Sequence, residues 1–147
     1  MKIRTSVAAA GAAVVLAGAG AILLPAVASA HSTTHTLKFT AVQLKQANFS
    51  KTSGGSAEQD VNSAGKTIGF DVIHFQFNPK TNSGSINVAL STNGGILYGA
   101  LKASTGPVIK GTVTGGTGTF KGATGTIVGK QLNKAGTKTA VTITYSS

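Results

Sequence analysis

Asp71 is the residue whose place in the sequence best fits chemistry, because it opens a run in which apolar and polar side chains alternate. Alternate side chains of an extended strand share a face, so Asp71 falls on the face of Ile73, Phe75 and Phe77. A carboxyl group on an apolar interior face is desolvated, which raises its pKa and suits general acid or base catalysis. If the protein is an enzyme, we predict Asp71 as its catalytic residue. The favoured interpretation, however, is that the strand starts one residue later and that Asp71 is a solvated rim residue or a turn cap.

The other two acidic residues, Glu58 and Asp60, lie in a polar stretch rich in Ser and Gly that spans residues 48–64. No hydrophobic period runs through this stretch, which is typical of a long, mobile connection. Charged side chains are normally solvated in such a segment. The sequence therefore predicts no role for these two acids in a site.

Beyond residue 30, short runs of Thr, Val, Ile and Phe recur between Gly, Asn, Ser and Pro, and no window shows convincing helical periodicity. This pattern is typical of an all-β sandwich or barrel. The short, turn-rich connections indicate antiparallel neighbours. The candidate strands span residues 36–44, 67–77, 84–91, 96–101, 108–114, 124–131 and 139–145.

The strand patterns place apolar side chains on one face of the sheet. Ile86, Val88 and Leu90 share a face, and so do Leu37, Phe39 and Ala41. With no helix to cover it, such a sheet must close on itself or pair with a second sheet. The predicted ligand-binding residues on this interior face are Ile73, Phe75, Phe77, Val88 and Leu90.

A glycine-rich tract at residues 113–125 reads Val-Thr-Gly-Gly-Thr-Gly-Thr-Phe-Lys-Gly-Ala-Thr-Gly. Glycine disfavours helix and permits bends and close backbone contacts, so the tract predicts a corner between two strands, with Phe120 as its buried anchor. Its spacing resembles a signature of the allene oxide cyclase and dirigent barrel superfamily, in particular of small secreted bacterial members. The resemblance spans roughly residues 67–145 and implies a closed, antiparallel, eight-stranded barrel.

The resemblance also implies a cavity for a small molecule. Plant cyclases of this superfamily hold an unstable epoxide in an apolar barrel, and dirigent proteins hold phenoxy radicals between acidic and basic residues. Neither set of polar residues has a motif match here that would carry it over. The resemblance therefore implies a binding cavity rather than a particular reaction.

The first 30 residues have the features of a signal peptide. Lys2 and Arg4 precede an apolar run that ends in Ala28-Ser-Ala30, a sequence that fits signal peptidase cleavage. A membrane anchor is the competing interpretation, but Pro25 breaks the run and no positive stop-transfer cluster follows it. We predict a signal peptide at residues 1–30, a single barrel domain at 31–147 and a secreted product.

Cleavage after Ala30 would leave 11 lysines, no arginine and three acidic residues, a formal charge of +8. Specific recognition of nucleic acid favours arginine and stacking aromatics, so nucleic acid is not expected as a specific partner. Scattered lysines are typical of solvated strand faces and protected sheet edges. The alternative interpretation of the lysines is attraction to an anionic cell-wall polymer. A homo-oligomer is a further possible assembly.

Other site chemistries find little support. His31 at a mature N-terminus, with His35 or His74, could form a copper-binding histidine brace, but frayed terminal residues are the favoured interpretation. The chain has no cysteine, which excludes a thiolate zinc site. The Gly and Ser spacings fit neither a phosphate-binding loop nor a Gly-x-Ser-x-Gly hydrolase motif. We predict no cofactor and no metal.

The sequence thus predicts a secreted barrel that binds or shapes a small apolar or phenolic molecule. The alternatives are a structural or cell-wall-associated surface module with a packed, ligand-free barrel, and an isomerase or cyclase that uses Asp71. Barrels of eight strands can be filled or hold one ligand, so strand number does not choose between them. With one interior ionisable group in view, binding without turnover is expected.

Overall fold

The computed structural model describes residues 32–103 and 106–147. The predicted signal peptide and His31 lie outside these residues. The described chain forms eight β-strands and one short 3-10 helix. The elements are β1 Thr34–Asn48, β2 Ser53–Val61, β3 Thr67–Asn78, β4 Ser83–Thr92, β5 Gly95–Ala103, β6 Val108–Gly116, η1 Gly118–Phe120, β7 Thr124–Gln131 and β8 Lys138–Ser146.

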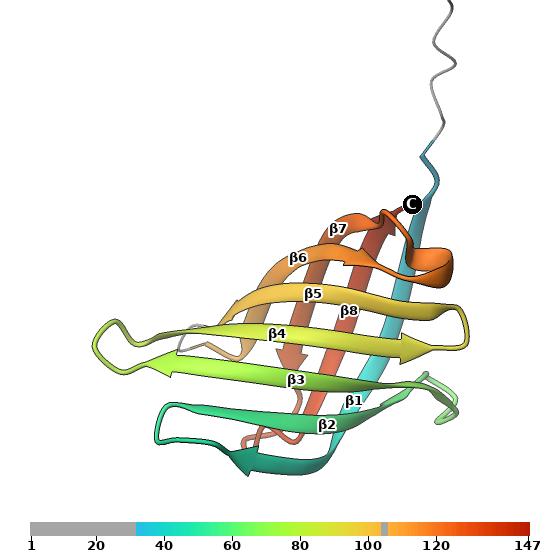
Figure 1. Ribbon diagram of the computed structural model, residues 1–147. Helices are drawn as coiled ribbons and strands as arrows, with labels where there is room; N and C mark the ends of the chain where they lie inside the picture. The colour runs from blue at the N-terminus through green and yellow to red at the C-terminus, as the bar shows by residue number, and fades with distance from the viewer. Residues whose placement is uncertain (1–31, 104–105) are drawn as a thin grey trace, which may run out of the picture. The chain divides into compact units, whose positions relative to one another are not determined.

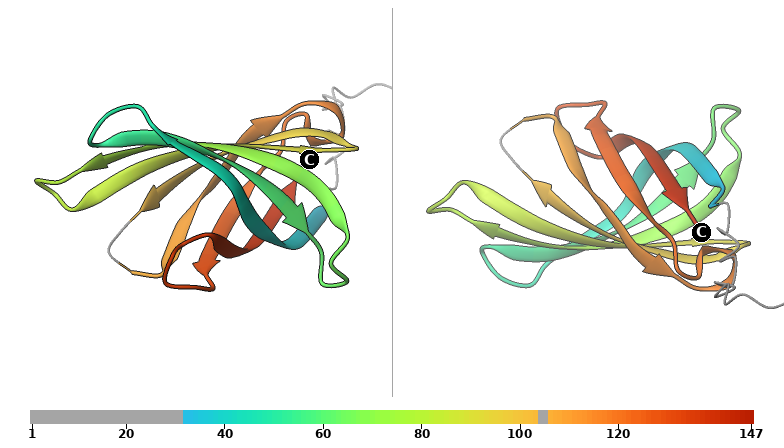
Figure 2. Two further views of the ribbon diagram at one scale, coloured as in Figure 1. Left: turned by 90° about the horizontal axis from the view of Figure 1, so that it is seen from below. Right: turned by 90° about the horizontal axis from the view of Figure 1, so that it is seen from above.

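The strands form a closed barrel in chain order, and every neighbouring pair is antiparallel. β8 closes the barrel by pairing with the first part of β1, while the second part of β1 pairs with β2 (Figures 1 and 2). The predicted eight-stranded antiparallel barrel is therefore confirmed. In the described part of the chain, no helix is long and apolar enough to cross a membrane.

β2 corrects the prediction of a connection at residues 48–64. Ser53–Val61 is a strand that pairs with β1 on one side and β3 on the other. The usual hydrophobic alternation is absent because the inward positions carry small or acidic residues. Gly54, Glu58 and Asp60 are the buried members of this strand.

The barrel interior is filled largely by aliphatic and aromatic side chains. Leu90 and Leu97 are fully enclosed. The inward faces predicted for β1 and β4 are confirmed, because Phe39, Ala41 and Leu90 are all buried. The buried core consists of Phe39, Ala41, Leu90, Leu97, Leu101, Val113, Phe120, Ala123, Ile127, Ile143 and Tyr145.

The glycine-rich tract forms the predicted corner between β6 and β7. η1 lies in this corner and places Phe120 in the core, where its ring meets that of Tyr145 edge to face at 5.5 Å. The backbone N–H of Thr119 donates to the carbonyl of Gly94 at 2.9 Å, which fixes the corner to the β4–β5 turn. Gly118 has a φ of 59° and lies against the Gly94 carbonyl. The corner thus packs on the turn at one end of the barrel.

Candidate functional site

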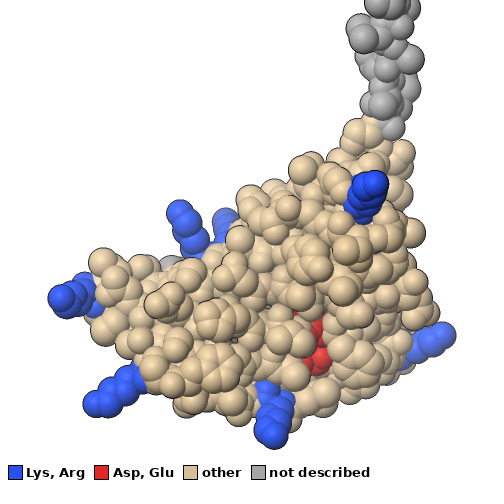
Figure 3. Space-filling model, viewed as in Figure 1, with Lys and Arg blue, Asp and Glu red and all other residues tan. Residues whose placement is uncertain are grey.

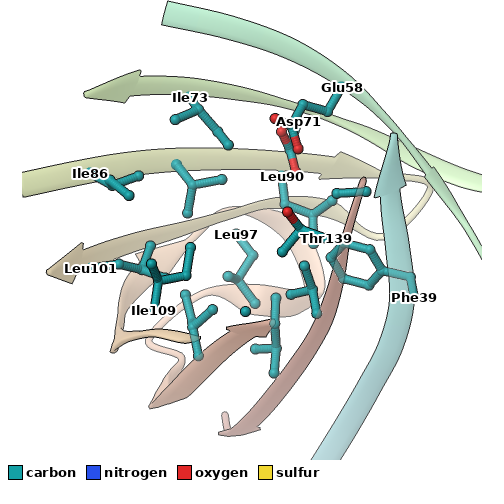
Figure 4. A pocket seen from close by; sticks show the side chains of 16 residues that line it. Phe39, Glu58, Asp71, Ile73, Ile86, Leu90, Leu97, Leu101, Ile109 and Thr139 are labelled. Atoms are coloured by element: carbon teal, nitrogen blue, oxygen red, sulfur yellow. The ribbon is translucent and has the colours of Figure 1, made fainter. Parts of the chain in front are cut away.

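The barrel encloses a cavity of about 70 Å³, lined mostly by apolar side chains (Figure 4). Three polar side chains interrupt the apolar wall: Glu58 from β2, Asp71 from β3 and Thr139 from β8. The other lining residues are Phe39, Ala41, Ile73, Ile86, Val88, Leu90, Leu97, Leu101, Ile109, Ile127, Gly129, Val141 and Ile143. The interior is therefore neither packed solid nor as large as the roughly 300 Å³ at the lower end of sites for drug-sized ligands.

Asp71 lies inside the barrel, so the favoured interpretation of a solvated rim position or turn cap is wrong. Its side chain is 4% exposed and contributes to the cavity wall, whereas its neighbour Val72 points outward and is 62% exposed. The β3 alternation that placed Asp71 in phase with Ile73 is correct at this end of the strand. The catalytic role of Asp71 stays a prediction.

The predicted ligand-binding residues divide into two groups. Ile73, Val88 and Leu90 line the cavity. Phe75 is half-buried and Phe77 is 42% exposed, and neither contributes to the cavity wall. Phe75 still pairs with Gly54 of β2, whereas Phe77 lies beyond the last β2–β3 pair, where the β3–β4 hairpin projects past β2 (Figures 1 and 2).

Glu58 and Asp60 correct the prediction that they are solvated charges. Their side chains are 9% and 0% exposed, respectively. Glu58 is the direct β-sheet partner of Asp71, and Asp60 lies two residues further along the same face of β2. Residues directly opposite on antiparallel strands have Cβ atoms about 4.5–5.5 Å apart. β2 and β3 therefore bring three carboxyl groups together inside the barrel, which we call the acidic cluster.

The acidic cluster has few hydrogen-bond donors. Ser56 Oγ donates to Glu58 Oε1 at 3.1 Å. Within the described part of the chain, both carboxyl oxygens of Asp60 and Oδ1 of Asp71 have no hydrogen-bond partner. If one of these two groups is protonated, it can donate to the other, so Asp60 and Asp71 are placed to share a proton.

Burial is the main reason why the acidic cluster holds protons. Desolvation raises the pKa of Asp71 to about 8, helped by the negative charges of Asp60 and Glu58 and by the hydrogen bond that the two Asp groups form when one of them is protonated. Desolvation also raises the pKa of Asp60 to about 7, against the lowering effect of its hydrogen bond with Asp71. The pKa of Glu58 is raised by burial and partly lowered by the Ser56 hydrogen bond. Asp71 is thus largely a neutral acid at pH 7, able to donate a proton.

Charge is divided between the inside and the outside of the barrel. Glu58, Asp60 and Asp71 are the only acidic residues of the sequence. The 11 lysines from Lys38 to Lys138 are all exposed. In Figure 3 the lysines stand out around the face on which the acidic residues form one small patch. Among the described residues, no Lys, Arg or His lines the cavity, so the cluster has no cation beside it there.

The histidines lie away from this cluster. His35 is exposed and stacks on Tyr145, and His74 is exposed and stacks on Phe49. His31 lies outside the described residues. Within residues 32–103 and 106–147, no group of three His, Asp or Glu side chains could hold a metal ion.

Among the described residues, Thr139 is the one neutral polar side chain of the cavity wall. Its hydroxyl group points into the space shared with Asp71 and Leu90 in Figure 4. The sequence carried a signal for it, because Thr139 is in phase with the inward-facing Val141 and Ile143. With the acidic cluster it makes one side of the cavity polar and leaves the other side apolar. Such a wall can orient a small molecule with a polar end toward Asp71.

No protein-family model matches the chain, and no curated protein matches it in sequence. Solved structures do resemble it. The exo-specific intermolecular Diels-Alderase AbnU aligns with a TM-score of 0.64 and 10% identity, over 78% of this chain and 99% of AbnU. The pterocarpan synthase dirigent protein GePTS1 aligns with a TM-score of 0.65 and 16% identity, over 78% and 88% of the two chains.

A third similar structure is a nonspecific heme-binding cyclase that catalyses [4 + 2] cycloaddition during neoabyssomicin biosynthesis. It aligns with a TM-score of 0.66 and 12% identity, over 78% of this chain and 64% of the cyclase. At these identities the likeness concerns the fold. The chain has the barrel fold of the allene oxide cyclase and dirigent type, as the glycine-rich tract predicted.

Proposed function

We propose that this barrel binds a small apolar or phenolic molecule in its cavity and shapes it in a dirigent- or cyclase-like manner. The observation that supports the proposal best is a neutral carboxyl group, Asp71, on the wall of an otherwise apolar cavity. Apolar area favours entry of the ligand, and the protonated Asp71 donates to an oxygen or to a developing negative charge on it. The dirigent and cyclase-like proteins of the same fold agree with this use of the cavity.

Proton transfer at Asp71 fits the arrangement of the cluster. The proton that leaves Asp71 can be restored from solvent through its neighbours, because Asp60 and Glu58 also bind protons more tightly than solvated acids do. The expectation of binding without turnover rested on a single interior ionisable group, and that premise is wrong. Asp71 is therefore proposed as the general acid, with Asp60 and Glu58 setting its protonation.

A pair of matched substitutions tests the cavity. Val88→Phe adds a ring to the cavity wall, whereas Val72→Phe adds the same ring on the outer face of the neighbouring strand. In calorimetry with a panel of phenols and fatty-acid-derived alcohols, we expect small phenols to bind to the parent and to Val72→Phe, and we expect loss of that binding in Val88→Phe. Absence of binding across this panel would favour the structural module with a ligand-free barrel.

Asp71→Asn separates binding from chemistry. The amide keeps the size of the side chain but cannot transfer the proton, so we expect affinity within about threefold of the parent and loss of any turnover seen by mass spectrometry. Equal turnover in parent and variant would remove Asp71 from the reaction.

Secretion is part of the proposal and depends on the sequence of the first 30 residues. Cleavage after Ala30 predicts a mature protein that begins at His31, which intact-mass measurement of exported protein checks. A mass that retains the first 30 residues would contradict the signal peptide. The lysine-covered exterior supports attraction to anionic cell-wall polymers, and a homo-oligomer is a further proposal.

A further inference from the structure

The acidic cluster lacks a positive partner. Buried carboxylates are normally paired with a cation or fully hydrogen-bonded, because an isolated buried charge is costly. Here Glu58, Asp60 and Asp71 lie on one inward face of two neighbouring strands, and no basic residue lines the cavity within the described part of the chain. The exposed lysines do not fill this role, because their side chains lie on the exterior.

A second observation is that one carboxyl group with an unpartnered oxygen lines the cavity. Asp71 lines the cavity and is only 4% exposed. Its Oδ1 atom has no hydrogen-bond partner in the described chain. Glu58 lines the same cavity, and Figure 4 shows its side chain beside that of Asp71. Asp60 is fully buried two residues from Glu58 on the same face of β2, and apart from a proton shared with Asp71 its two oxygens have no hydrogen-bond partner in the described chain. A ligand in the cavity therefore meets two carboxyl groups directly and the charge of a third at short range.

Three kinds of ligand group can be compared at this wall. An anionic group meets like charge and is disfavoured. A neutral hydroxyl group satisfies one oxygen but leaves the repulsion within the cluster unchanged. A cationic nitrogen donates hydrogen bonds to the carboxylates and also offsets their mutual repulsion, and charge-assisted hydrogen bonds are roughly twice as strong as neutral ones.

We propose that the ligand of this cavity carries a cationic nitrogen, which pairs with Asp71 and Glu58 while the apolar part of the molecule packs against the aliphatic wall. This inference rests on the binding part of the proposed function, since it names the chemical class of the molecule that the barrel binds. With the cation bound, Asp71 is a carboxylate that accepts hydrogen bonds, and it is a proton donor only toward neutral ligands. A cavity of about 70 Å³ suits a small molecule of this class rather than an extended one.

Binding of such a cation is linked to proton release. At pH 7 the cluster holds protons because burial and like charge favour the neutral acids. The entering cation replaces those protons, so they pass to the buffer and the affinity rises between pH 6 and pH 8. The titratable groups that face the site come from β2 and β3, whereas the nearby walls from β1, β4 and β8 contribute Phe39, Ala41, Leu90 and Thr139, which do not titrate.

The experiment uses three probes that share one ring: benzylamine, benzyl alcohol and benzoate. We expect calorimetry at pH 8 to show benzylamine binding at least about tenfold more tightly than benzyl alcohol, as one charge-assisted hydrogen bond implies. Benzoate should be the weakest of the three. Titrations in phosphate and in HEPES, two buffers without a primary alkylammonium group, should give different apparent binding enthalpies for benzylamine, because protons are released to the buffer.

Two variants locate the preference. Asp71→Asn should reduce the ratio of benzylamine to benzyl alcohol affinity to within about threefold of one, since one ionised oxygen pair is lost. The double variant Asp71→Asn with Asn87→Asp restores the formal charge on the exposed outer face of β4. It should behave like the single variant. A restored preference in the double variant would assign the effect to overall charge and would overturn the inference.

Other results would overturn the inference of a cationic ligand without contradicting the proposed function. Equal affinity of the parent for benzylamine and benzyl alcohol at pH 8 contradicts a cationic ligand but leaves the binding cavity in place. Failure of all three probes to bind also overturns it, and the panel of phenols and fatty-acid-derived alcohols then decides separately on the proposed function. If Asp71→Asn does not fold, the pH dependence and the proton release of the parent still decide.

Discussion

At the scale of single residues, alternation in the sequence offered the inward orientation of Asp71 beside the favoured rim position, and it gave no sign of the two acids next to Asp71. Alternation along β3 placed it with Ile73, and both line the cavity. The same rule wrongly placed Phe77 on the wall of the cavity. Alternation predicts the direction of a side chain, but it does not predict where the barrel interior ends. Glu58 and Asp60 were missed because acidic side chains normally point to solvent. Their inward positions follow from the pairing of β2 with β3.

Phe120 gives a prediction at this scale. Its ring is 4% exposed and packs on Tyr145, so Phe120→Ala should lower the free energy of unfolding by about 3–5 kcal/mol, as deletion of a packed aromatic does. Phe70→Ala is the matched control, because Phe70 is 52% exposed and should cost about 0.5 kcal/mol or less. Urea denaturation measures both. Equal losses would show that the corner does not depend on its buried ring.

At the scale of elements, β2 was the strand that the sequence pattern did not reveal. Its inward side chains are small or acidic, so hydrophobic periodicity could not mark it. A topological signal was present nevertheless. Consecutive antiparallel strands alternate in direction, so an odd number of them would bring the first and last strands together in parallel. Seven candidate strands therefore required an eighth, and the stretch at 48–64 had room for it.

The glycines of the corner can be compared by substitution with alanine. Gly118 and Gly122 have positive φ values of 59° and 75°, so either change should cost about 1–2 kcal/mol in backbone strain. An added Cβ at Gly118 would also press on the carbonyl of Gly94, whereas nothing lies near one at Gly122. Gly118→Ala should therefore be the more destabilising of the two in thermal or urea unfolding. The reverse order would contradict docking of the corner on the β4–β5 turn.

At the scale of the whole molecule, the barrel separates its charges. All three acidic residues are buried, and the lysines of the described residues are exposed. Composition predicted a cationic exterior, since lysines dominate the sequence. It could not show that the few acids are almost entirely buried, with only a small patch visible at the surface (Figure 3). The exterior therefore attracts anions while the interior disfavours them, so a ligand of the cavity and a partner of the surface need opposite chemistry.

This separation predicts an unusual dependence of stability on pH. The pKa values of Asp60 and Asp71 are raised to about 7 and about 8. Between about pH 4 and pH 8 the folded protein therefore holds protons that the unfolded chain releases, so stability falls as pH rises through this window. The slope should reach about 1.4 kcal/mol per pH unit for each proton held.

Urea denaturation from pH 4 to pH 9 measures this slope directly. Asp71→Asn should flatten it, because one of the raised acids is removed. The matched outer-face variant Asn87→Asp should keep the slope of the parent, because an exposed carboxyl group gains no raised pKa from burial. A parent protein that is most stable near pH 8 would contradict a buried acidic cluster.

The protonation of Asp71 at neutral pH is the property on which the proposed function depends most directly. The sequence contains three Asp and Glu side chains in total, so a carbon-13 NMR titration of side-chain carboxyl groups follows every one of them. We predict that the two Asp signals titrate together, with apparent pKa values of about 7 and about 8, and that the Glu58 signal titrates above its usual range. Titration of both Asp signals near pH 4, as for solvated acids, would contradict the proposed site.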